Sequence, residues 1–398
     1  MSVNRTALVI GGGIAGPASA MALQKAGIEA TVYEAYPTPA DGVGAFLTLA
    51  SNGIDALRVL GADEPVLEAG FPTPRITLRS GTGKRLGVSP LGETLADGTT
   101  SQTLKRADLY QALHDQALSR GIGLEFGKRL VMAEESGHGV RATFADGSVA
   151  TADVLIGCDG LHSTVRRILD RHARGPRYAG LVGTGGYARG VALDSAPGEY
   201  EMIFGKRAFF GYVVAAGDEV WWFANVPQAK DGPVREVAGA QLRKRLLALF
   251  AEDAGPAVEL IEASADVMPM TPFHWMPPLR TWHGGRIVVI GDAAHAPTPT
   301  SGQGASLAIE DAVVLAKCLR DMPEAPTAFA RFEALRRPRV ERIVRWAVRL
   351  NRSKASGPVG RVVRDAVLPT LLRITANSKA AREPFDYHIE WDETWAAA

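Results

Sequence analysis

The sequence predicts an α/β protein: a discontinuous Rossmann-like domain, an antiparallel-sheet domain inserted into it, and a helical C-terminus. Three observations predict this class. A buried strand at 7–10 runs into a glycine-rich turn and a helix, as a dinucleotide-binding fold begins. Alternating β-like runs fill much of 177–270, and a buried strand at 286–290 then returns to the character of the first domain. From 329 onward the pattern is mainly helical.

Composition and charge are those of an ordinary globular protein. The 398 residues are enough for two or three packed units. A net charge of +1 provides no field that would attract nucleic acid or a membrane surface. There is no apolar run of about 18 residues and no secretory pattern, so we expect a cytoplasmic protein without a membrane span. Cys158 and Cys318 show no metal-like spacing, so we expect two buried thiols and no metal.

The first motif is the strand–turn–helix sequence GGGIAG at 11–16. Gly11 permits the sharp turn, Gly13 lets the backbone approach a pyrophosphate, and Gly16 lets the helix pack closely on the strand. The helix N-terminus then directs free N–H groups at the anion. Glu34 ends the next predicted strand, where a carboxylate can accept hydrogen bonds from ribose hydroxyls. This motif predicts a dinucleotide site but does not separate NAD from FAD.

Two further motifs lie where other predicted strands end. The buried strand at 154–157 is followed by Asp159, and the strand at 286–290 by Asp292. Because ligands bind at the carboxyl ends of parallel strands, we expect both aspartates to face one crevice. A proline loop then leads to the sequence GQG at 302–304 and a helix to about 319. The N-terminus of that helix is a second positive dipole end, suited to a reduced isoalloxazine ring.

The elements between the motifs follow from hydrophobic periodicity and turn residues. In chain order we predict a helix at 52–60, a hairpin at 75–87, a helix at 106–120, a hairpin over 140–156, strands at 209–215 and 219–226, and a helix at 234–250. A glycine-rich run at 183–188 fits the dinucleotide pattern loosely, but no helix follows it, so we interpret it as a turn or bulge in a sheet. We interpret the arginines that follow position 335 as the solvated face of a packed helix.

Three motifs in this order resemble the class A flavin monooxygenases, the group that includes para-hydroxybenzoate hydroxylase and urate hydroxylase. The resemblance covers about residues 5 to 350 and implies FAD as the cofactor. The division that it implies is an FAD-binding domain at 1–74, 100–176 and 275–328, a substrate-binding β-sheet domain at 75–99 and 177–274, and a C-terminal helical region at 329–398.

The resemblance also implies individual site residues. Glu34 matches the ribose-binding acid, Arg106 an arginine near the flavin phosphate and ribityl chain, and Asp292 the ribityl-binding aspartate. Ser306 departs from the pattern, because many relatives carry Asn there. The cofactor-binding residues implied are Gly11, Gly13, Ala15, Gly16, Glu34, Gly44, Ala45, Arg106, Leu130, Asp159, Asp292, Pro299, Gly302, Gln303 and Gly304.

The implied activity is a monooxygenase cycle. NADH or NADPH reduces FAD, O2 forms a C4a-hydroperoxide, and an electron-rich aromatic or heteroaromatic small molecule takes the distal oxygen. Arg207 matches an arginine near the active site of the urate-hydroxylating branch and is the catalytic residue implied. The alternative for Arg207 is a solvated arginine at a strand end. We expect a monomer or homodimer that binds neither nucleic acid nor membrane.

An apolar sheet should cover the flavin ring, because water and stray protons promote loss of the peroxide. The aromatic candidates for this cover, most of which core packing also explains, are Phe204, Phe209, Tyr212, Trp221, Phe223, Phe273 and Trp275. Three other functions stay open: an FAD oxidase or dehydrogenase, a non-catalytic carrier on the same fold, and an NAD-dependent dehydrogenase. Intact motifs argue against the carrier, and a plain NAD enzyme would leave the 292–304 segment without a purpose.

Overall fold

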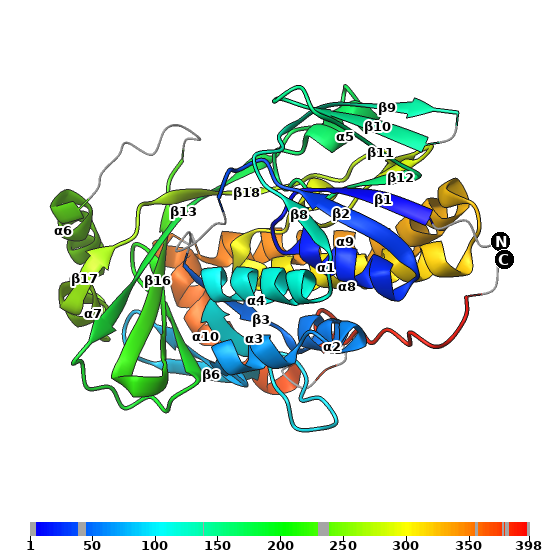
Figure 1. Ribbon diagram of the computed structural model, residues 1–398. Helices are drawn as coiled ribbons and strands as arrows, with labels where there is room; N and C mark the ends of the chain where they lie inside the picture. Colours follow the sequence, from blue (N-terminus) through cyan, green and yellow to red (C-terminus); the bar gives the residue numbers. More distant parts are fainter. Residues whose placement is uncertain are drawn as a thin grey trace.

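The computed structural model describes residues 5–38, 45–137, 139–229, 239–354, 357–375, 378 and 382–395. Its centre is a six-stranded sheet with the order β19-β20-β12-β1-β2-β8 (Figure 1). The strands are β1 (Arg5–Ile10), β2 (Ile28–Tyr33), β8 (Gly123–Glu125), β12 (Val154–Gly157), β19 (His283–Gly284) and β20 (Ile287–Val289). All pairs are parallel except that of β19 with β20. The strand order reverses at β1, as a Rossmann-like fold requires.

Helices cover one face of this sheet and a second, smaller sheet covers the other (Figure 1). Helices α1 (Ala15–Lys25) and α8 (Gly304–Asp321) pack on each other, with α4 (Arg106–Ser119) beside α1. The smaller sheet contains β9 (Leu130–Ser136), β10 (Gly139–Phe144) and β11 (Val149–Ala152). Our predicted hairpin over 140–156 is therefore divided, because β11 pairs with β10 whereas β12 enters the central sheet.

An eight-stranded sheet forms the other half of the molecule, with the path β17-β13-β16-β15-β14-β5-β6 and β18 paired to β13. Its strands are β5 (Arg75–Ser80), β6 (Arg85–Pro90), β13 (Arg177–Arg189), β14 (Glu199–Phe204), β15 (Phe209–Val214), β16 (Glu219–Pro227), β17 (Ser264–Val267) and β18 (Thr271–Trp275). The run at 183–188 is a continuous part of β13 and pairs without interruption with β16. Its pairing with β17 shifts register after Gly186, so the run is strand with an irregular edge and not a turn. Because β5 and β6 join this sheet, we propose that 75–99 belongs with 177–274.

Alternate residues of β15 and β16 point to opposite faces of the eight-stranded sheet. On one face Phe210 and Trp222 stack with ring centroids 5.5 Å apart, in a core shared with α6 (Gly239–Phe250) and α7 (Ala257–Ala263). Tyr212 belongs to this core, so it does not line the cover that we predicted. The opposite face turns toward a small sheet. The strands of that sheet are β3 (Phe46–Leu49), β4 (Phe71–Pro72) and β7 (Gln102–Lys105).

The C-terminal region is helical, as predicted. Helix α9 (Ala325–Lys354) packs on α8, and α10 (Pro358–Thr375) packs on β6. Shorter helices precede them: α2 (Ser51–Leu60), α3 (Glu64–Ala69) and α5 (Thr164–Leu169). Within the described ranges no helix is long and apolar enough to cross a bilayer. The same residues contain no cluster of His, Cys, Asp and Glu that could bind a metal.

Candidate active site

In the turn after β1, two glycines have no room for a side chain and a third glycine has. Gly11 has a φ of +106°, and a Cβ there would lie 2.5 Å from the Cys158 carbonyl oxygen. A Cβ on Gly16 would lie 1.9 Å from the Gly11 carbonyl oxygen, so only glycine lets α1 approach the turn. A Cβ on Gly13 would meet no atom within 4 Å. The fold itself therefore requires Gly11 and Gly16, whereas the space above Gly13 is left for something else.

Glu34 lies beside this turn, just after β2. Its carboxylate accepts hydrogen bonds from the backbone N–H groups of Gly12, at 2.6 Å, and Tyr36, at 2.9 Å. A later segment of the chain also lies beside Glu34. The N–H of Lys128 donates to the Glu34 carbonyl oxygen at 2.7 Å. Leu130 is buried two residues on, at the start of β9. The structure thus brings the segment that leads into Leu130 to the end of β2.

Asp292 lies just beyond β20, in a short 3-10 turn. Its side chain is exposed although Gly291 and Ala293 on either side are buried. No described residue donates a hydrogen bond to its carboxylate. Burial among the surrounding protein raises the pKa of Asp292, while His295 and Arg106 act in the opposite direction. A carboxylate enclosed by protein and open on one side is a suitable acceptor for sugar-chain hydroxyls.

The start of α1, where the first motif ends, lies close to the Asp292 turn of the third motif. That Asp159 and Asp292 face one crevice stays a prediction. A Cβ on Gly291 would lie 3.5 Å from the Cβ of Ala15, the first residue of α1. Nearby, Arg106 begins α4 with an exposed side chain, and its N–H donates to the Ala45 carbonyl oxygen at 3.0 Å. Gly44 lies outside the described residues, so its predicted role is not placed.

The loop before α8 also leaves space open. The chain turns through Pro299 and then Gly302, which has a φ of +63°. A Cβ on Gly302 or Gly304 would meet no atom within 4 Å. Gln303 between them is buried, and its Oε1 accepts a hydrogen bond from Asn52 at 3.1 Å. The Nε2 of Gln303 is a buried donor without a partner in the described chain.

The glycine turn, the Asp292 carboxylate and the loop before α8 together fit an extended anionic cofactor. Neither α1 nor α8 has a side-chain cap or an acidic residue in its first turn. Both helices therefore present free N–H groups and a positive dipole end. Open space at Gly13 and Gly304, the unpaired amide of Gln303 and the enclosed carboxylate of Asp292 fit the phosphates, ring and ribityl chain of FAD.

Asp159 has a structural task in this arrangement. Its carboxylate accepts from the Ser163 hydroxyl at 2.5 Å and from the N–H groups of Thr164 and Val165 at 2.6 and 3.1 Å. Burial raises the pKa of Asp159, and these hydrogen bonds oppose the rise. The carboxylate thus satisfies the free N–H groups at the start of α5. Contact of Asp159 with a cofactor stays a prediction.

Arg207 lies apart from the other predicted residues. It precedes β15, in the connection from β14, and its exposed guanidinium forms an ion pair with Glu252. The same guanidinium donates to the Ala248 carbonyl oxygen at 3.2 Å. A catalytic role would require the Arg207 side chain to leave these partners, and that role stays a prediction.

A buried ion-pair cluster lies beneath the loops, and sequence analysis missed it. The Nη2 and Nε atoms of the fully buried Arg336 lie 2.6 Å from Glu310 and 2.7 Å from Asp311. Arg339, also buried, pairs with Glu310 at 2.9 Å. Burial alone would raise both carboxyl pKa values, but the two arginines lower that of Glu310, and His295 with Arg336 lowers that of Asp311 to about 2. Our interpretation of these arginines as solvated is wrong for Arg336 and Arg339.

The cluster connects helix α9 to the loop at Asp292 and to the loop before α8. Asp311 accepts a hydrogen bond from the N–H of Gly291 at 3.0 Å. Glu310 accepts from Asn52 at 2.6 Å, and the same Asn52 amide donates to Gln303. The sequence carries one signal for this cluster: two adjacent acids in the middle of an otherwise apolar predicted helix, where burial demands cationic partners.

A row of aromatic rings, which we call the aromatic wall, covers one face of the eight-stranded sheet. Phe46 lies 5.4 Å from Trp221 and 6.2 Å from Phe223, between ring centroids. Phe223 lies 6.1 Å from Phe209, and Tyr187 lies 5.5 Å from Trp221. The wall begins at Phe46, directly after the segment predicted to lie near the flavin ring. Three of its five members belong to the cover that we predicted.

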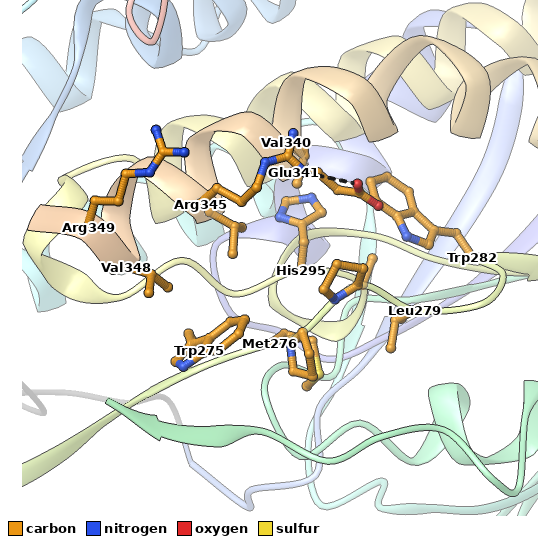
Figure 2. A pocket seen from close by; sticks show the side chains of 14 residues that line it. Trp275, Met276, Leu279, Trp282, His295, Val340, Glu341, Arg345, Val348 and Arg349 are labelled. Atoms are coloured by element: carbon orange, nitrogen blue, oxygen red, sulfur yellow. Dashed lines mark hydrogen bonds and ion pairs between the residues drawn. The ribbon is translucent and has the colours of Figure 1, made fainter. Parts of the chain in front are cut away.

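A separate cavity of about 230 Å³ lies against Ala294 and His295, which follow Asp292 in the chain. Trp275 and Met276 form one wall, and α9 contributes Arg345 and Arg349 opposite them (Figure 2). His295 also lines it. Trp275 therefore faces this cavity and does not belong to the aromatic wall. None of the described residues that we predicted to bind the cofactor lines it.

The fold and the site define an α/β flavoprotein, and the features that fit FAD follow the carboxyl ends of β1 and β20. The sequence profile of the FAD binding domain family matches residues 4–347. The chain is 33% identical over 355 residues to aurachin C monooxygenase/isomerase of Stigmatella aurantiaca, covering 88% of this chain and 90% of that protein. It is 34% identical over 349 residues to an FAD-dependent urate hydroxylase of Klebsiella pneumoniae, covering 85% and 87%.

A solved structure agrees with these relatives. Klebsiella pneumoniae HpxO complexed with FAD and uric acid superimposes with a TM-score of 0.84 at 28% identity, covering 95% of this chain and 96% of that chain. The chain belongs to the FAD binding domain family, within the class A flavoprotein monooxygenases. Our predictions of family, fold class, FAD as cofactor and monooxygenase activity are confirmed.

Proposed function

We propose that this NAD(P)H-dependent enzyme hydroxylates an electron-rich aromatic or heteroaromatic small molecule that lies on the aromatic wall. The carrying observation is that the wall begins at Phe46, next to Ala45, whose carbonyl oxygen accepts from the N–H of Arg106. The charge of Arg106 in turn opposes the rise in pKa that burial causes at Asp292, which fits the ribityl chain of FAD. Bound FAD, once reduced by NADH or NADPH, supplies activated oxygen to the substrate. The relatives are monooxygenases and hydroxylases, which supports oxygen insertion over the oxidase, carrier and dehydrogenase alternatives.

The residues of this chain position the reaction. The N-termini of α1 and α8 provide the donors for phosphate and for negative charge on the ring. Asp292 would accept hydrogen bonds from the ribityl chain and Glu34 from the ribose, while Arg106 lies near the phosphate. The aromatic wall excludes water from the reacting side. Composition and cysteine usage support a cytoplasmic protein, and we propose a monomer or homodimer.

Oxygen incorporation tests the proposed function directly. The purified protein should be yellow, and NADPH or NADH oxidation should rise severalfold with a substrate from a panel of phenols, purines and polyketide-like aromatics. Mass spectrometry under ¹⁸O2 should find a product one labelled oxygen heavier. Substrate-dependent oxidation that yields only hydrogen peroxide and a dehydrogenated product would support the oxidase alternative instead.

Asp292→Ala should weaken FAD binding by about tenfold or more. The variant removes a charged acceptor from an enclosed position, and a hydrogen bond to a charged group is worth about 1.5–3 kcal/mol. The dissociation constant of FAD from reconstituted apoprotein measures the effect. Asp292→Asn is the matched control and should retain part of the affinity, because its amide oxygen still accepts. An Asp292→Ala protein with wild-type affinity would contradict the assignment.

A further inference from the structure

Lys354, the last residue of α9, lies against the aromatic wall. Its Nζ is 3.9 Å from the centroid of the Phe209 ring and 5.9 Å from that of Phe223. In the described part of the chain no acid and no carbonyl group forms a hydrogen bond or ion pair with it. Among the described residues the cation therefore has aromatic faces as its partners and no counter-ion. Sequence analysis missed this lysine, because a single cation at a helix end has no distinguishing pattern.

The same end of α9 is attached to the loop predicted to lie beside the flavin ring. The Thr300 hydroxyl donates to Oδ1 of Asn351 at 2.5 Å. Asn351 is buried, and its Nδ2 has no hydrogen-bond partner in the described chain. Since Asn351 lies one helical turn before Lys354, one turn of α9 contacts both the loop and the wall. A substrate between them would lie within reach of the Lys354 ammonium.

The surroundings of Lys354 leave a place for an anion. Part of the side chain is accessible, but the ammonium lies among protein atoms, and this burial lowers the pKa of Lys354 to about 7. Contact with aromatic faces offsets some of the lost hydration, whereas a buried cation is best stabilised by a hydrogen-bonded anion. Arg364 provides a contrast. It lies 4.4 Å from the Phe204 ring, but Asp365 pairs with it at 2.8 Å.

We propose that Lys354 binds the anionic group of the substrate and so selects aromatic rings that carry a carboxylate or a comparably placed anion. The proposal rests on the proposed function and deepens it, because it names the charge of the molecule on the aromatic wall. Lys354 lies beyond residues 4–347, which the family profile matches. The selectivity is therefore a property of this chain's own C-terminal region.

Paired ligands test the proposal without turnover. Calorimetric titration of the oxidised holoenzyme would compare salicylate with salicylamide and 4-hydroxybenzoate with 4-hydroxybenzamide, which differ in charge but hardly in shape. For at least one pair, the wild type should bind the carboxylate about tenfold or more tightly than the amide, as expected for a charge-assisted hydrogen bond. Lys354→Met should bring that ratio close to one by weakening the carboxylate alone. Lys354→Arg should restore most of it.

Arg364→Met is the matched control, since it also removes a cation from an aromatic ring, but a cation that Asp365 already pairs in the wild type. It should keep the wild-type ratio. A wild type that binds neither member of either pair, or that binds both members equally, overturns the proposal. So does a ratio that survives Lys354→Met or that falls equally in the control. Failure of the proposed function would be seen separately, as an enzyme that binds the carboxylates but inserts no oxygen into any substrate.

Discussion

Gly13→Val will yield a folded protein that purifies without FAD. An added Cβ at Gly13 meets no protein atom within 4 Å, and Gly13 does not have a positive φ, so the apoprotein should accommodate the larger side chain. The valine methyl groups would occupy the space that the fold leaves above the turn, where we place the pyrophosphate. Steric overlap of this kind costs about 3 kcal/mol or more, which corresponds to about a hundredfold loss of affinity.

The measurements are the visible spectrum, the FAD dissociation constant and the thermal unfolding of the apoprotein. Gly16→Ala is the control, because its Cβ would lie 1.9 Å from the Gly11 carbonyl oxygen. That variant should lose structure as well as colour, whereas Gly13→Val should unfold within a few degrees of wild-type apoprotein. A yellow, active Gly13→Val enzyme would place the phosphates elsewhere.

Arg336→Met will lower the free energy of unfolding by about 3–5 kcal/mol, the usual cost of removing one partner from a buried ion pair. The guanidinium is fully buried between Glu310 and Asp311. Methionine fills part of the volume but leaves Asp311 without its arginine and Glu310 with Arg339 alone. Since Asp311 also binds the N–H of Gly291, the variant should bind FAD more weakly too.

Urea-induced unfolding, followed by tryptophan fluorescence, measures the loss for Arg336→Met. Arg345→Met is the matched control on the same helix. Its exposed guanidinium lies 3.4 Å from Glu341, and such surface pairs contribute at most about 1 kcal/mol. Equal stability losses in the two variants would show that the buried cluster contributes no more to the free energy of unfolding than a surface ion pair does.

Much of the fold could be predicted because its signals are local. The turn at Gly11, the packing at Gly16 and the acid at Glu34 depend on spacing within one strand–turn–helix unit, and hydrophobic periodicity marks the strands on either side. The prediction that Asp159 and Asp292 face one crevice rests on the ends of two such strands and stays a prediction. For these elements the backbone conformation follows from neighbouring residues.

Closely spaced glycines and strand ends were enough to predict the fold class and a dinucleotide site, and the resemblance of three motifs to a known family predicted the family and the flavin cofactor. The buried arginines of α9, the members of the aromatic wall and the place of Lys354 became visible in the three-dimensional arrangement alone. Burial and charge pairing depend on partners that folding brings together from distant parts of the chain. Arg336 and Asp311 are distant in the sequence, as are Lys354 and Phe209. No sequence pattern marks the members of either pair as partners.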